Sequence, residues 1–151
     1  MKEFPYVDFN QGLDARLFTP WYLDQISKLS KVKIRFALDS DGYRKYVSDA
    51  IQLAKKNGIK DFGVYVLIGY KESVEEAIDR LEFIRSLGVW PNPMRFQPLD
   101  AKIKNSYIPP GWTSKELSSM SRYYSRLAWL DGISYEQYKD REEQFVPLLD
   151  I

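Results

Sequence analysis

The stretch FGVYVLIGYKESVEE, residues 62–76, decides the fold, because it contains a strand, a turn and the start of a helix. Residues 62–68 are an almost continuous apolar run, which is typical of a parallel strand covered on both faces. Ser73 and Glu76 have the spacing of a capping box and predict the first turn of a helix. Gly88 stands where that helix is expected to end. The stretch therefore predicts one (βα) unit.

The same order of strand, polar cluster and amphipathic helix recurs along the chain. The predicted strands are centred near Val7, Ile34, Val64 and Met94. Their spacing is about 30 residues, the size of a (βα) unit. After Gln97 the pattern changes, and capping boxes at residues 113–116 and 134–137 predict two further helices. The chain therefore predicts an α/β fold with a parallel (βα) repeat over residues 1–100. Residues 101–151 are expected to form a helical extension packed on the same domain.

Composition narrows both the chemistry and the location of the protein. Hydrophobic residues make up 44% of the chain, charged residues 28%, and the formal net charge is +1, so nucleic-acid binding is not indicated. No apolar run approaches the roughly 20 residues that cross a bilayer, and the first residues lack a signal-peptide pattern. We therefore expect a cytoplasmic protein without a membrane partner. The absence of Cys and His excludes disulfides, thiolate catalysis and an iron–sulfur site built by this chain alone.

Polar residues follow each predicted strand, and in parallel α/β folds the carboxyl ends of the strands form the ligand site. The clusters are Asn10-Gln11, Asp39-Ser40-Asp41, Gly69-Tyr70-Lys71-Glu72 and Gln97. Each also has an ordinary structural interpretation. Asp14 can pair with Arg16 in a turn, Ser40 or Asp41 can cap a helix, and Gly69 can form a tight turn.

Arg95 and Gln97 alternate with Met94 and Phe96 in the last predicted strand. Alternation places Arg95 and Gln97 on one face of that strand. In a barrel this face is expected to be the lumen, where a buried arginine needs a partner. The pair is therefore predicted to contribute to a polar, functional lumen.

The order of these motifs resembles the second half of radical S-adenosylmethionine enzymes over roughly residues 6–100. The segments that carry the resemblance are residues 8–16 (DFNQGLDAR), 35–40 (RFALDS), 65–72 (YVLIGYKE) and 94–98 (MRFQP). In the third segment Gly69 and Glu72 agree with the family's G-x-I-x-G-x-x-E pattern. Tyr65 replaces the first Gly of that pattern, and Leu67 replaces its Ile. The resemblance implies an incomplete TIM-like barrel of about four strands, similar to strands three to six of the family's barrel.

The resemblance also implies which residues approach the cofactor and the substrate. Those expected at the cofactor are Asn10, Gln11, Asp39, Ser40, Leu67, Gly69 and Gln97, and those expected at the substrate are Asp14, Arg16 and Arg95. Asp39 and Ser40 are expected at the ribose hydroxyls, for which carboxylates are good acceptors. Leu67 is expected under the adenine ring, and Arg16 suits a carboxylate because its guanidinium binds in a bidentate manner. No catalytic residue is assigned, and no metal site is expected.

One departure from the family limits what this chain is expected to do. The cluster-binding loop C-x₃-C-x₂-C and the first two strands have no counterpart in the sequence. S-adenosylmethionine and a 4Fe–4S cluster are therefore expected only in an intact parent protein, and this chain is expected to be inactive alone. Since four strands cannot close a barrel, the expected partner is the missing N-terminal half or a second copy, besides a small-molecule ligand.

Two alternative functions remain open from the residues. The first is a stand-alone module that binds a nucleoside-type ligand without chemistry. The second is a metal-dependent hydrolase or transferase that uses Asp39 and Asp41, since carboxylates are the usual ligands of Mg²⁺.

Overall fold

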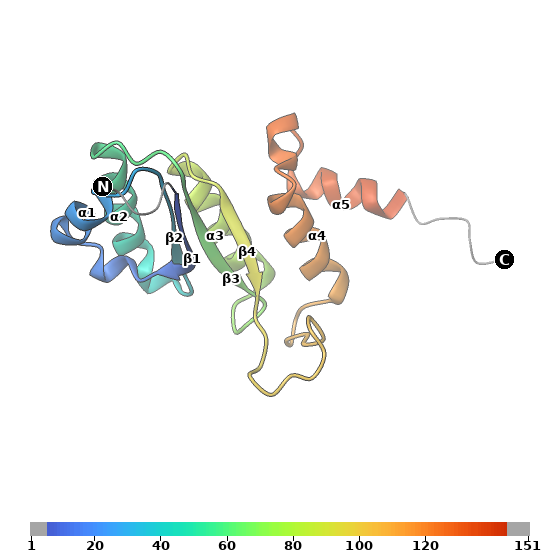
Figure 1. Ribbon diagram of the computed structural model, residues 1–151. Helices are drawn as coiled ribbons and strands as arrows, with labels where there is room; N and C mark the ends of the chain where they lie inside the picture. Colours follow the sequence, from blue (N-terminus) through green and yellow to red (C-terminus); the bar gives the residue numbers. More distant parts are fainter. Residues whose placement is uncertain (1–5, 145–151) are drawn as a thin grey trace.

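Four parallel strands alternate with helices in the computed structural model, which describes residues 6–144 (Figure 1). The strands are β1 (Val7–Leu13), β2 (Val32–Leu38), β3 (Phe62–Ile68) and β4 (Pro91–Arg95). The α-helices are α1 (Pro20–Ser27), α2 (Arg44–Lys56), α3 (Val74–Ser86), α4 (Ser114–Ser125) and α5 (Tyr135–Gln144). Short 3₁₀ turns lie at Ala15–Leu17, Asp41–Tyr43 and Ala128–Asp131.

The sheet has the strand order β1-β2-β3-β4, so each strand pairs with its sequence neighbour. All three pairings are parallel, with Ile34 opposite Phe62 and Leu67 opposite Met94. In the described part of the chain β1 and β4 each pair on one side, so the sheet does not close. This architecture is the predicted α/β fold, an open parallel sheet of the kind found in an incomplete barrel.

The two faces of the sheet differ in burial. One face packs against the helices, and its β2 and β3 side chains are fully buried: Ile34, Phe36, Leu38, Val64, Val66 and Ile68. The alternating residues of the same strands, such as Arg35, Tyr65 and Leu67, point to the other face and are only partly buried. We call this second surface the open face. The apolar run at residues 62–68 predicted cover on both faces, whereas the structure covers only the helix side.

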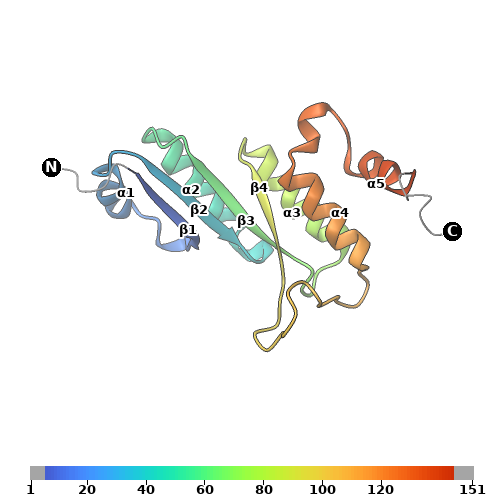
Figure 2. The same cartoon turned by 45° about the vertical axis from the view of Figure 1, so that its right-hand side comes forward.

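The C-terminal helices extend the helix side rather than the open face. α4 lies beside α3 and β4 (Figure 2). Tyr124 of α4 is fully buried, and its hydroxyl donates a 2.6 Å hydrogen bond to Glu82 of α3. Burial, followed by that carboxylate, raises the pKa of Tyr124 well above its usual range, so the phenol stays protonated. The segment after β4 therefore supports the sheet from the side of α3.

Candidate functional site

A pocket of about 190 Å³ lies where β1 and β2 end, at the carboxyl edge of the sheet. Its lining residues are Gly12, Asp14, Arg16, Ala37, Asp39 and Tyr43. The loops that follow β3 and β4 leave the sheet at the same edge, the lower end in Figure 1. The pocket brings together three residues predicted as ligand contacts, Asp14, Arg16 and Asp39. This edge is where parallel (βα) proteins place their ligands.

An irregularity near the end of β1 shapes one wall of this pocket. Phe9 pairs with Ile34 and Leu13 pairs with Phe36, so four steps along β1 correspond to two along β2. Gly12 lies in the extra segment with a φ of 62°, and a Cβ there would be 3.3 Å from the Ala37 Cβ. A glycine is therefore needed for the backbone to approach β2 so closely.

Asn10 and Gln11, both predicted at the cofactor, are exposed in the same irregular segment of β1. The Gln11 amide donates a 3.3 Å hydrogen bond to Asn10 Oδ1. The structure therefore places both side chains next to the pocket but not among its lining residues.

The Arg16 guanidinium is held by Asp14 in two-pronged fashion. Arg16 Nε is 2.9 Å from Asp14 Oδ1, and Arg16 Nη2 is 2.6 Å from Asp14 Oδ2. The hydrogen bonds from Arg16 lower the pKa of Asp14. The guanidinium also lies over the Tyr43 ring, 4.9 Å from its centroid. The ordinary interpretation, pairing within a turn, is thus realised, and a ligand carboxylate would have to compete with Asp14 for Arg16.

Asp39 differs from its acidic neighbours because it keeps an exposed carboxylate. It has no ion pair or hydrogen bond with any residue between 6 and 144, although it lines the pocket. Ser40 adopts an extended backbone before the turn Asp41–Tyr43, and its side chain makes no capping hydrogen bond. The predicted capping role of Ser40 is therefore not formed, and Asp39 remains available as an acceptor.

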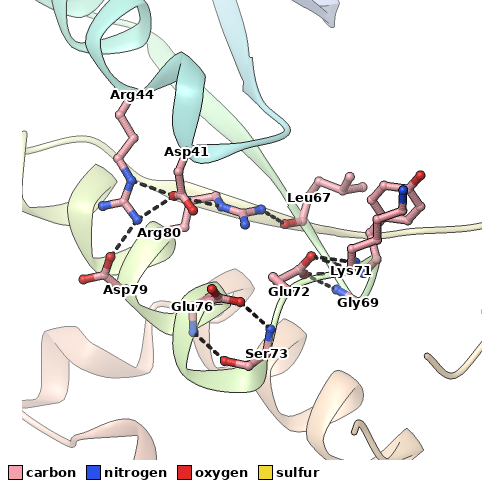
Figure 3. Close-up of polar contacts among 11 residues, drawn as sticks. Asp41, Arg44, Leu67, Gly69, Lys71, Glu72, Ser73, Glu76, Asp79 and Arg80 are labelled. Carbon is pink, nitrogen blue, oxygen red and sulfur yellow. Dashed lines mark hydrogen bonds and ion pairs between the residues drawn. The ribbon is translucent and has the colours of Figure 1, made fainter. Parts of the chain in front are cut away.

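Asp41 belongs to a network of ion pairs on the helix side of the sheet (Figure 3). Its carboxylate is 2.7 Å from Arg44, and Arg44 reaches Asp79 of α3 at 2.6 Å. Arg80, which is 3% exposed, donates to the Leu67 carbonyl at 3.0 Å and lies 3.5 Å from Asp41. Burial opposes ionisation of Asp41, but the two arginines outweigh it and lower its pKa.

This network disfavours the metal-dependent alternative. Asp41 is already neutralised by two guanidinium groups, so Asp39 lacks a free carboxylate partner. Among residues 6–144 no group of three or more acidic side chains is arranged to hold a metal ion.

We expect the Asp41 ion pairs to make stability depend on acid. The folded-state pKa of Asp41 is lowered, so its contribution is present above the ordinary carboxyl value of about 3.9 and is lost as the pH falls through the lower, folded value. Asp41→Asn should therefore reduce the free energy of unfolding at pH 7 by less than about 1 kcal/mol, because the carboxylate is half-exposed. Urea titrations from pH 7 to 2 should show this difference shrinking as the pH falls below the ordinary carboxyl value; a constant difference would contradict it.

Glu72 closes the β3–α3 loop instead of facing the pocket. Its carboxylate accepts hydrogen bonds from the backbone amides of Gly69 at 2.6 Å and Lys71 at 3.1 Å (Figure 3). Ser73 and Glu76 form the predicted capping box at the start of α3. The structural interpretation of this motif is thus realised, with the Glu72 carboxylate filling the group of amides that an anion would otherwise occupy.

Arg95 and Gln97 lie at the far side of the carboxyl edge from the pocket, because β4 is the opposite end of the sheet from β1. Both side chains contact the backbone of Asn105. Arg95 donates a 2.9 Å hydrogen bond to the Asn105 carbonyl, and the Asn105 backbone N–H donates a 3.4 Å hydrogen bond to Gln97 Oε1. Gln97 lies two residues past the end of β4, so alternation within that strand does not place its side chain. Arg95 pairs in register with Ile68, whose side chain is on the helix face, so Arg95 is not on the open face. The helices form the outside of a (βα) barrel, so the predicted lumen position of Arg95 is wrong, while that of Gln97 stays a prediction.

The open face carries polar residues that the sequence motifs did not single out. Arg35 forms an ion pair with Asp8 of the neighbouring strand and lies over the Tyr65 ring, 5.9 Å from its centroid. The hydrogen bond to Asp8 raises the pKa of Arg35. Leu67, predicted under the adenine ring, lies on this face beside Met94. In the sequence, Lys33 and Arg35 alternate with apolar residues along β2, and this pattern indicates a polar face of the sheet.

Comparisons with known proteins add no assignment: no family model, curated protein or solved structure matches the chain. Within residues 6–144 no helix is both long and apolar enough to cross a membrane. The geometry of the carboxyl edge is therefore what bears on function.

Proposed function

We propose that this chain is the cofactor- and substrate-supporting part of a larger parallel (βα) barrel of the radical S-adenosylmethionine class. In this proposal its carboxyl edge binds the ribose diol of the cofactor, and further (βα) units complete the sheet. The observation that carries the proposal is the combination of an open sheet with a free carboxylate, Asp39, in a polar pocket at the strand ends.

The size of the pocket supports a shared site. Pockets that bind small molecules usually measure roughly 300–1,000 Å³, whereas this one measures about 190 Å³. It suits a ribose-sized group rather than a whole nucleoside. The remaining wall is then supplied by the rest of the barrel.

The outer edge of β1 supports completion by further strands. Within the described residues β1 pairs only with β2, which leaves a row of backbone groups unpaired. Helix α1 and the 3₁₀ turn before it add exposed apolar surface, because Trp21 of α1 is 67% exposed and Leu17 of the turn is 63% exposed. An apolar hollow of about 250 Å³ lies between β1 and α1, lined by Phe9, Trp21, Tyr22, Gln25, Ile26 and Leu29. A neighbouring strand and its helix would satisfy both the backbone and the apolar side chains.

The residues present fit one part of the family's chemistry and not the other. Asp39 can accept hydrogen bonds from two vicinal hydroxyls, which fits a ribose. A 4Fe–4S cluster requires thiolates, and this chain has no Cys, so it cannot ligate the cluster by itself. The chain's own contribution is to bind and orient the cofactor.

Diol recognition can be tested with adenosine and 2′,3′-dideoxyadenosine, using ¹H–¹⁵N NMR titration of the chain. We expect saturable, millimolar binding of adenosine, with shifts near Gly12 and Asp39, and at least about tenfold weaker binding of the dideoxy compound. Asp39→Asn should lose a similar factor, because a hydrogen bond to a charged group contributes about 1.5–3 kcal/mol. Asp100→Asn, which neutralises another exposed carboxylate, should bind as the wild type does.

Two results would count against the proposal. Equal binding of adenosine and its dideoxy analogue would exclude diol recognition by Asp39. Micromolar binding of adenosine by a monomeric chain would favour the stand-alone module, because the chain would then need no other wall for its pocket.

A further inference from the structure

The opposite edge of the sheet, where the strands begin, presents a row of residues that the carboxyl-edge site does not use. Tyr6, Lys31, Asp61 and Trp90 each stand immediately before a strand. Backbone hydrogen bonds fix them as neighbours: Val7 donates to Lys31 at 3.0 Å, Ile34 to Asp61 at 3.1 Å and Val64 to Trp90 at 3.3 Å. Tyr6 and Lys31 are opposite each other in register, whereas Asp61 and Trp90 are each displaced by two residues along the strand from the preceding member, so the row is staggered. We call this surface the amino edge.

Two adjacent hollows run along the amino edge, the upper end of the sheet in Figure 1. The larger measures about 620 Å³ and is lined by residues that include Tyr6, Lys31 and Asn57. The smaller measures about 390 Å³ and includes Trp90. Both are lined by Lys60 and Asp61, so they form neighbouring parts of one groove that reaches from Tyr6 to Trp90.

The charge around this groove is positive. Lys31 and Lys60 line it together with one carboxylate, Asp61, and four further lysines lie at the ends of α1 and α2 and near the start of β2: Lys28, Lys33, Lys55 and Lys56. Two carboxylates offset them in part, since Asp24 is 2.9 Å from Lys28 and Asp61 is 3.5 Å from Lys33. Lys31 and Lys60 form no ion pair with any residue between 6 and 144, and both line the groove.

Helix dipoles explain only some of these lysines. Basic residues in the last turn of a helix, as in α2, are favourable whatever the function. Lys31 and Lys60 lie outside α1 and α2, in the connections to the next strands, so capping does not account for them. Their charge is a property of the groove itself.

Exposed aromatic rings stand at the two ends of the groove. Tyr6 is 49% exposed and Trp90 is 59% exposed, and neither takes part in a ring contact with another described residue. Cations bind phosphates, and exposed rings stack on unpaired bases; the two together are typical of surfaces that bind single-stranded nucleic acid.

We propose that the amino edge binds single-stranded nucleic acid, with Lys31 and Lys60 at the phosphates and with Tyr6 and Trp90 stacked on bases. This site is independent of the proposed cofactor site, because it lies at the other end of every strand. The near-neutral net charge of the chain gives no sign of this site, since 21 acidic residues nearly balance 22 basic ones over the whole sequence.

The test is fluorescence anisotropy of a labelled 15-nucleotide oligothymidylate at several salt concentrations, with the full chain. Lys31→Ala/Lys60→Ala should weaken binding at least tenfold and flatten the slope of log K against log salt by about 1.4, since each phosphate contact contributes about 0.7. Trp90→Ala should weaken binding about tenfold without changing that slope. The matched controls are Lys102→Ala/Lys104→Ala and Tyr46→Ala, exposed residues that line neither hollow.

Three outcomes would overturn the proposal: no binding by the wild type, equal loss in the control variants, or loss in the lysine variant with no effect of Trp90→Ala. The last would indicate a polyanion recognised by charge alone. Thermal unfolding of each variant separates lost binding from lost folding, and Trp90→Phe, which keeps an aromatic ring, should restore most of the affinity.

Discussion

Gly69→Ala is expected to lower the free energy of unfolding by about 2–5 kcal/mol, more than the same change at any other glycine of the chain. Gly69 has a φ of 72°, a conformation that costs an L-residue roughly 1–2 kcal/mol. A Cβ there would also lie 2.6 Å from Leu117 Cδ2. Leu117 is 1% exposed, so it has little room to move, and overpacking adds about 1–3 kcal/mol.

A second glycine separates the cost of the left-handed backbone from the cost of overpacking. Gly58 has a φ of 78°, but a Cβ there would meet no atom within 4 Å. Gly58→Ala should therefore show only the backbone cost, about 1 kcal/mol. Urea unfolding followed by circular dichroism measures both variants. Equal losses of unfolding free energy at the two positions would contradict the close packing of Leu117 of α4 against Gly69 in the β3–α3 loop.

Arg80→Met is expected to lower the free energy of unfolding by about 2–3 kcal/mol. The buried guanidinium bonds the Leu67 carbonyl at 3.0 Å and faces Asp41 at 3.5 Å, so its removal leaves both oxygens without that cation. Hydrogen bonds to charged groups contribute about 1.5–3 kcal/mol, and methionine fills much of the same space. Arg80→Lys should recover only part of the loss, because one ammonium group cannot reproduce the guanidinium fork.

An exposed ion pair provides the control for this variant. Lys45 pairs with Asp49 on the surface of α2, and its side chain is 81% exposed. Lys45→Ala should change the free energy of unfolding by less than about 0.5 kcal/mol. If Arg80→Met were equally mild, the ion-pair network between α2 and α3 would contribute nothing to the fold.

The repeat of strands and helices could be predicted because its signals are local. The capping boxes at Ser73 and Thr113 each act within four residues, and the structure forms both of them. The grouping of Asp14, Arg16 and Asp39 also followed from sequence, because parallel strands bring their carboxyl ends to one edge.

Features that depend on pairing between distant segments could not be predicted. The register shift in β1 depends on how Gly12 packs against Ala37, and local propensity does not encode this. The burial of Arg80 depends on a carbonyl in β3 and a carboxylate after β2. The sequence signal for this burial is that Arg80 falls on the apolar stripe of α3, between Ala77 and Ile84.

The measurement that tests the central proposal most directly is the DNA sequence on both sides of the coding region and in neighbouring genes. We predict a coding segment for about 60–100 residues that form two (βα) units and carry C-x₃-C-x₂-C. Such units are about 30 residues each, and the cluster needs three thiolates. The product of that segment should bind this chain along the outer edge of β1. A region without any such segment would contradict a radical S-adenosylmethionine origin and leave the sheet to be completed by some other partner.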